Sequence, residues 1–141
     1  MTRLFSAGLA GTLAMTAMMY VMAPMMGVHM DIAAMLGSMM GGSWMAGMAV
    51  HLMNGSFVFP LAFGYLAAPR LPGPAAARGS LFGVALWLVA QGMVMPMMGA
   101  GLFSADAGGA AAAGASLMAH LVYGAILGGL SGQAERQLAV A

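Results

Sequence analysis

The sequence predicts an all-α protein: a four-helix transmembrane bundle made of two parallel tandem two-helix repeats. Composition is the first reason, because 62% of the 141 residues are hydrophobic and only 5% are charged. A soluble domain carries about 25% charged residues, so this chain could not cover a surface exposed to water. Four long apolar stretches are the second reason, and two motifs that each occur twice are the third.

Four apolar stretches are each long enough to cross a bilayer, which takes about 20 helical residues. The first begins at Leu4, and no clear signal-peptide cleavage site closes it, so we expect it to be retained as a helix. A proline-rich break separates the second stretch from the third. The spans are predicted at about residues 4–26, 44–68, 79–98 and 110–130.

Short segments connect and follow these spans. After the first span, Asp31 can cap a short helix whose apolar residues enter the membrane interface. The glycine-rich loop at 101–109 is expected to be less regular, and residues 133–141 are expected to form a short interfacial tail. Residues 1–141 are therefore read as a single membrane domain, with repeat one at about 1–68, a linker at 69–78 and repeat two at about 79–132.

The charged residues predict the orientation of the spans. Asp31 and Asp106 fall on one side of the membrane, and all the arginines fall on the other side. The positive-inside rule makes the arginine side cytoplasmic, so both termini are expected in the cytoplasm. The four arginines are Arg3, Arg70, Arg78 and Arg136.

Two short motifs occur twice, in the same order. Pro24-Met25-Met26-Gly27 recurs as Pro96-Met97-Met98-Gly99, and the pattern His-Leu-x-x-Gly begins at both His51 and His120. Because each unit holds two spans, both copies enter the membrane in the same direction, which predicts a parallel repeat about an axis along the membrane normal. His51 and His120 should then lie at equal depth in the outer half of the bilayer.

Histidine within a membrane span is costly and is by default a functional candidate. His51 and His120 could ligate a haem b iron, as in bis-histidine membrane cytochromes, share another metal ion or carry protons. The alternative is structural, with each neutral ring bonded to a backbone carbonyl or a hydroxyl. The sequence leaves these alternatives open.

Methionine is the compositional outlier, with 19 in the chain. Thioether sulfur is a soft ligand suited to copper(I), and the first span has a methionine stripe at helical spacing: Met15, Met18, Met19, Met22, Met25 and Met26. The methionines matched in both copies, and hence the candidate metal ligands, are Met25, Met26, Met97 and Met98. Methionine is also a flexible apolar filler, and that interpretation stays open. His29 and Asp31 could supplement a metal site or form a solvated loop.

The composition of the spans disfavours several function classes. They hold no Asp, Glu, Lys or Arg, and no Ser-His-Asp constellation or phosphate-binding glycine loop is visible, which disfavours hydrolytic and phosphoryl-transfer enzymes. The net charge of +1 is too small to indicate a nucleic-acid partner. Three classes remain: a haem- or metal-binding membrane protein, a small transporter or channel, and a non-catalytic subunit or assembly factor that binds another membrane protein or a second copy.

The paired motifs and the segment Arg78-Gly79-Ser80-Leu81-Phe82-Gly83 resemble an uncharacterised family of small four-span bacterial inner-membrane proteins. The resemblance covers nearly the whole chain. It implies the fold and a location in the bacterial inner membrane. Because that family is a domain of unknown function, the resemblance implies no activity, cofactor or catalytic residue.

Overall fold

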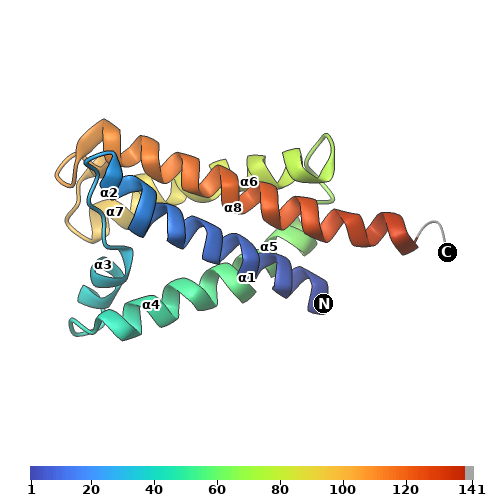
Figure 1. The fold of residues 1–141 in the computed structure, drawn as a ribbon, viewed down its shortest axis with the longest axis horizontal. Helices are drawn as coiled ribbons and strands as arrows, with labels where there is room; N and C mark the ends of the chain where they lie inside the picture. The colour runs from blue at the N-terminus through green and yellow to red at the C-terminus, as the bar shows by residue number, and fades with distance from the viewer. Residues whose placement is uncertain (139–141) are drawn as a thin grey trace.

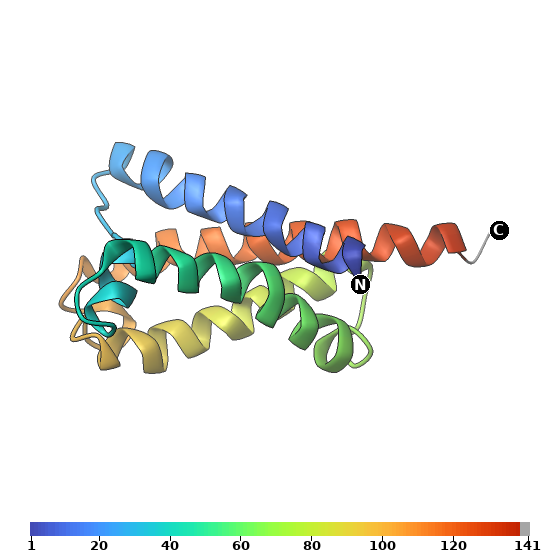
Figure 2. The same ribbon diagram turned by 90° about the horizontal axis from the view of Figure 1, so that it is seen from below.

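The protein is all-α, as the sequence predicts, and the described residues contain no strand. A computed structural model describes the backbone of residues 1–138 and the side chains of residues 1–132. Its spans lie side by side in an elongated bundle, with the short helix α3 (Ile32–Ser38) at one end (Figures 1 and 2). The four helices long and apolar enough to span a membrane are Thr2–Met25, Trp44–Ala67, Ala75–Met97 and Gly109–Gly132.

Three of the four spans consist of α-helical pieces joined by π-helical turns. The first span comprises α1 (Thr2–Ala17), a π turn (Met18–Met22) and α2 (Ala23–Met25). The second comprises α4 (Trp44–Met53), a π turn (Asn54–Val58), α5 (Phe59–Ala62) and another π turn (Phe63–Ala67). The third comprises α6 (Ala75–Val89), a π turn (Ala90–Val94) and α7 (Met95–Met97). A short 3-10 helix, Leu102–Ser104, precedes the uninterrupted α8 (Gly109–Leu138).

Proline explains where the π turns occur. A proline ring has no N–H and crowds the carbonyl four residues earlier, so a regular α-helix cannot pass through it. In each π turn of the described chain, the residue just before a proline donates its N–H to the carbonyl five residues back. The wider turn keeps the helix continuous across the proline. The prolines concerned are Pro24, Pro60, Pro69 and Pro96, and α8 contains none.

The two Pro-Met-Met-Gly motifs end the first and third spans in the same way. Gly27 and Gly99 both have a φ of 77°, a left-handed conformation that glycine adopts without steric cost. The residue after each glycine donates its N–H to the carbonyl five residues earlier, as Ala100 does to Met95 over 3.0 Å. This is the Schellman motif, which ends a helix by satisfying its last carbonyls.

Glycine allows the third and fourth spans to pack backbone against backbone. A Cβ atom at Gly79 would collide with the carbonyl oxygen of Gly124, and one at Gly83 would collide with the carbonyl oxygen of His120. Membrane helices associate through such small residues because lipid provides no hydrophobic force between them. Helix α8 packs along both α6 and α1, so it is the helix around which the bundle is arranged.

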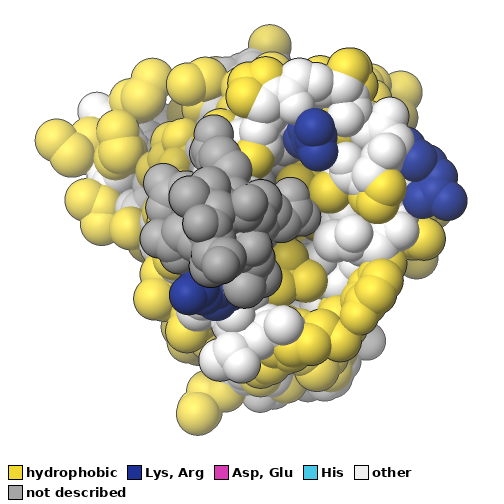
Figure 3. Space-filling view, turned by 90° about the vertical axis from the view of Figure 1, so that its right-hand side faces the viewer, with side chains coloured by type: hydrophobic (Ala, Val, Ile, Leu, Met, Phe, Trp, Pro, Cys, Tyr) yellow, Lys and Arg dark blue, Asp and Glu magenta, His cyan; other side chains and the backbone are white. Residues whose placement is uncertain are grey.

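The three arginines whose side chains are described, Arg3, Arg70 and Arg78, lie at the end of the bundle that carries the N-terminus, which we call the arginine end. Figure 3 views that end and shows basic side chains on it, with no acidic side chain among the described residues in view. The opposite end, which we call the α3 end, carries α3 and the connection between α7 and α8. Arg136 and the predicted tail at 133–141 lie outside the described side chains, although the backbone of α8 continues as a helix to Leu138.

The third span begins earlier than the sequence predicts. It starts at Ala75 rather than at Gly79, with Pro74 in extended conformation as the residue before the helix. Proline cannot continue a preceding helix but is well suited to the start of the next one. The connection between the second and third spans is correspondingly shorter than the predicted linker.

We expect Gly79→Ala to destabilise the bundle, because the new methyl group would push α6 away from the backbone of α8. Overpacking of this kind costs about 1–3 kcal/mol. Thermal unfolding of the purified protein in mild detergent measures the effect. Gly92→Ala is the matched control, since nothing lies within 4 Å of its Cβ position. Equal unfolding temperatures for the two variants would contradict the close contact.

Candidate functional site

A cavity of about 210 Å³ lies between all four spans, on the side of the bundle nearer α3. Both candidate histidines line it, His51 from α4 and His120 from α8. Most of the remaining lining is apolar, and Asn54 and Tyr123 are among its few polar side chains. The structure thus brings the two repeated histidines to the same internal space.

His51 is held by a threonine of the first span. Its Nε2 atom lies 2.9 Å from the hydroxyl oxygen of Thr16. That hydroxyl donates its one hydrogen to the carbonyl of Thr12, 2.7 Å away, so it can only accept from the histidine. The neutral His51 ring therefore carries its hydrogen on Nε2 and keeps a lone pair on Nδ1.

His120 is held by the backbone of its own helix. Its Nδ1 atom lies 2.8 Å from the carbonyl oxygen of Ser116, which can only accept a hydrogen bond. The neutral His120 ring therefore carries its hydrogen on Nδ1 and keeps a lone pair on Nε2. Each histidine uses one nitrogen to fix its position and leaves the other as a Lewis base, as metal-ligating histidines do.

Methionines complete the lining of the cavity. None of the four that line it is more than 9% exposed. The two imidazoles and four thioethers together form a set of soft and borderline donors. The four residues are Met15, Met19, Met30 and Met95.

The four methionines selected from the repeat lie elsewhere. Met25, Met26 and Met97 are 83%, 76% and 65% exposed, and Met98 is partly buried against the hydrophobic core. None of these four lines the central cavity. Among the described residues no group of three or more His, Cys, Asp or Glu could hold a metal ion.

Two of the cavity methionines were not among the methionines singled out from the sequence. Met15 and Met19 belong to the predicted stripe on the first span, but Met30 lies in a loop and Met95 directly precedes Pro96. Neither Met30 nor Met95 belongs to a repeated motif, so burial is the property that marks them. Thr16 was also missed, although its spacing of one helical turn from Thr12 predicts the hydroxyl-to-carbonyl bond that the structure shows.

Tyr123 joins the fourth span to the second beside the cavity. Its hydroxyl donates to the carbonyl oxygen of Gly55 over 2.8 Å, and the side chain is 1% exposed. In an α-helix that carbonyl would accept from Phe59, but the π turn directs the Phe59 N–H to Asn54. The π turn before Pro60 therefore leaves the Gly55 carbonyl without a helical donor, and Tyr123 satisfies it.

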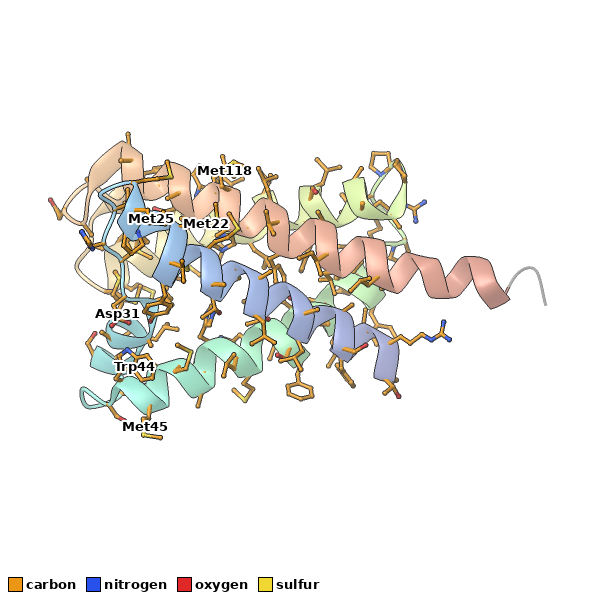
Figure 4. The ribbon with its side chains drawn as sticks, viewed as in Figure 1. Met22, Met25, Asp31, Trp44, Met45 and Met118 are labelled. Atoms are coloured by element: carbon orange, nitrogen blue, oxygen red, sulfur yellow. The ribbon has the colours of Figure 1, made fainter. Side chains whose placement is uncertain are left out.

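Helix α3 covers the cavity at one end and is fixed there by Asp31. As predicted, Asp31 caps the helix, accepting from the N–H of Ala34 over 2.9 Å. The same carboxylate accepts from the Tyr20 hydroxyl and, over 3.0 Å, from the Trp44 indole (Figure 4). Burial raises the pKa of Asp31, but the hydrogen bonds from Tyr20, Ala34 and Trp44 outweigh it and hold the pKa below its ordinary value. The adjacent His29 is exposed and does not line the cavity.

The second loop at the α3 end is anchored inside the bundle. The Ser104 hydroxyl donates to Gln91 Oε1 over 2.8 Å, and both residues are 0% exposed. Phe103 and Ser104 have φ values of 51° and 59°, a conformation that costs energy for residues other than glycine. Gln91 Nε2 has no partner among the described atoms. The loop predicted to be less regular is thus tied to the π turn of the third span.

Similarity to known proteins concerns the whole chain rather than the site. A family described as a family of unknown function (DUF6789) matches residues 3–139. The match extends over nearly the same length as the resemblance suggested by the motifs. No curated protein and no solved structure matches the chain.

We expect Asp31→Asn to loosen α3, because a neutral amide is a weaker acceptor than a carboxylate. The pKa of Asp31 is lowered in the folded protein, so its stabilising effect is complete above the unfolded value of about 4 and is lost as the pH falls through the folded value. Thermal unfolding from pH 7 to pH 3 should show a stability advantage of the wild type that disappears at the acid end. A constant difference between the two proteins across this range would contradict the role of the carboxylate.

Proposed function

We propose that this chain, which belongs to the DUF6789 family of unknown function, is a multi-pass membrane protein that binds copper(I) in its central cavity. One observation carries the proposal: His51 and His120 line a single cavity together with four buried methionines. Imidazole suits copper, and thioether selects its monovalent form. Copper ligated there would lie among residues from all four spans.

The hydrogen bonds of the two rings support ligation. Thr16 fixes His51 so that Nδ1 keeps its lone pair, and the Ser116 carbonyl fixes His120 so that Nε2 keeps its lone pair. Each ring can therefore bind a metal in its neutral form, without losing a proton. Because these hydrogen bonds already restrict the two rings, metal binding would cost less conformational entropy.

The charge of the cavity favours a monovalent ion. Among the residues that the structure describes, no aspartate or glutamate lines it, so no carboxylate there balances the charge of a bound metal. An uncompensated charge in a low-dielectric interior is costly, and the cost rises steeply with the size of the charge. Copper(I) brings half the charge of zinc(II) or iron(II).

Haem b is the weaker candidate for the same histidines. The cavity of about 210 Å³ is smaller than the roughly 300–1,000 Å³ of pockets that hold drug-sized ligands, and a haem is at least as large as those. His51 also uses its Nε2 atom for Thr16. Axial haem ligation through that atom would need both a wider space and a different position of His51.

We further propose that the two halves of the chain arose by duplication, as the motifs predict. The identical Schellman endings at Gly27 and Gly99 support this. The glycines four residues after the histidines also support a duplication, because each packs against the preceding span. Gly55 lies against α1 at Gly8, and Gly124 lies against α6 at Gly79. The two halves are not fully equivalent, since α8 packs closely along α1 while α6 meets the second span mainly near its end.

We infer that the arginine end faces the cytoplasm of a bacterium, by the positive-inside rule. Two arginines there are held by backbone carbonyls. Arg70 donates to Leu66 over 2.6 Å, and Arg78 donates to Gly73 over 2.7 Å. These contacts support an interfacial position for both guanidinium groups, with α3 at the outer surface.

The copper proposal is tested by titrating the purified protein with copper(I) against a coloured copper(I) chelator under reducing conditions. We expect the wild type to take up a single ion. His51→Ala and His120→Ala should each weaken binding by about tenfold or more, because each removes a ligand. Thr16→Val should weaken it by about tenfold, since partners that orient a ligand contribute 10–100-fold to affinity.

The matched control is His29→Ala, which removes an exposed histidine that does not line the cavity. Its affinity should equal that of the wild type. No copper binding by the wild type, or an equal loss in the control, would overturn the proposal. A haem absorption band in the purified protein that disappears in His120→Ala would assign the histidines to haem instead.

The orientation is tested with single cysteines, since the chain has none of its own. Ser38→Cys places a thiol in α3, and Pro72→Cys places one at the arginine end. In intact bacterial cells a membrane-impermeant maleimide should label the first and not the second. The reverse labelling pattern would place the arginines outside.

A further inference from the structure

A second hollow opens on the side of the bundle, between the first and fourth spans. Its volume is about 460 Å³, and its lining comes from the end of the first span, the loop that follows and the start of α8. Small residues of α8 leave the space open, and nothing lies within 4 Å of a Cβ atom placed at Gly114. The residues on this side are Ala110, Ala111, Gly114 and Ala115.

We call this hollow the methionine groove, because methionines from the first span, the following loop and α8 form most of the rest of its lining. Three of its methionines, Met22, Met26 and Met118, are more than half exposed, at 54%, 76% and 54%. Met19 and Met30 are only 8% and 9% exposed. Figure 4 shows Met22 on the first span and Met118 on α8 at this side of the bundle. The complete set is Met18, Met19, Met22, Met26, Met30 and Met118.

The methionine groove adjoins the central cavity. Met19, Met30 and Ser116 line both spaces. Exposed thioethers at the surface are therefore followed by buried thioethers in the partition, and then by the two histidines. This ordered set of donors leads from the surface of the bundle to its interior.

From this arrangement we infer that the methionine groove is the route by which copper(I) reaches the central cavity. The inference rests on the proposed copper site. A thioether has no proton to lose, so an ion can pass from one sulfur to the next by forming one Cu–S bond as another breaks. No change of oxidation state and no proton transfer is needed. The imidazoles at the end of the route then replace part of the sulfur set.

A lipid chain or a helix of a second copy could also fill an apolar groove. Neither requires sulfur, and both fit leucine as well as methionine. The placement of methionine at both the mouth and the partition is what favours copper(I) as the occupant. Exchange of these residues for leucine therefore separates the alternatives.

The test compares loading rates in two triple variants of the full chain. The groove variant combines Met22→Leu, Met26→Leu and Met118→Leu, which conserve volume and remove sulfur. The control combines Met25→Leu, Met45→Leu and Met97→Leu, which are exposed and line neither space. Stopped-flow transfer from a copper(I) chelate measures the rate, and the chelator titration measures the equilibrium affinity.

We expect the groove variant to load about tenfold more slowly, an increase in barrier of about 1.4 kcal/mol, with an affinity within about twofold of the wild type. The control should load at the wild-type rate. Gly114→Leu should also slow loading, because it fills the groove while keeping every sulfur. This second variant separates loss of the route from misfolding caused by the methionine changes.

The outcomes distinguish the route from the site. If the wild type binds copper and the groove variant loads at the same rate, the route is overturned and the copper site stands. If the control slows as much as the groove variant, or if the groove variant loses equilibrium affinity, the groove sulfurs do not act as a route. If the wild type binds no copper, both the site and the route are overturned.

Discussion

Inside a bilayer each backbone N–H and C=O must find a partner within the protein, and this constraint shapes the bundle around its prolines. The π turns before Pro24, Pro60 and Pro96 keep three spans continuous. The turn before Pro60 leaves the Gly55 carbonyl without a helical partner, and the buried hydroxyl of Tyr123 donates a hydrogen bond to it. His51 lies just before that turn. The hydrogen bond from the Tyr123 side chain to the Gly55 carbonyl joins the second and fourth spans beside His51, while the ring itself is held by Thr16.

Hydrogen bonding within the protein also determines which nitrogen of each histidine keeps its lone pair. Thr16 bonds to a carbonyl one turn earlier on its own helix, as hydroxyl side chains commonly do within helices. Having used its hydrogen there, it presents only an acceptor to His51, which selects the tautomer of that ring. For His120 the selecting acceptor is the backbone carbonyl of Ser116. An interior with few polar groups thus specifies which nitrogen of each ring remains basic, although no charged residue takes part.

The sequence predicted the features that depend on composition, and missed those that depend on helix rotation. The four spans and the cap at Asp31 follow from apolar length and local spacing. A helix that is apolar on all sides has no pattern to indicate which face turns inward. Met95 was missed for that reason, while the exposed Met25 and Met97 were predicted as ligands. Met30 lies in a loop, where no helical spacing indicates that it is buried. The contact between Gln91 and the strained loop could not be predicted from the sequence either, because nothing in the residue types Phe103 and Ser104 indicates a positive φ.

The glycine contact between α6 and α8 also bears on how the bundle assembles in the membrane. Helices joined by a short loop lose less chain entropy on pairing than helices distant in sequence. The third and fourth spans are neighbours in sequence and meet along their backbones, whereas Tyr123 must reach Gly55 in the second span. The C-terminal pair is therefore expected to form first, as a template on which the first two spans dock. Closure of the cavity would then be the last step of folding.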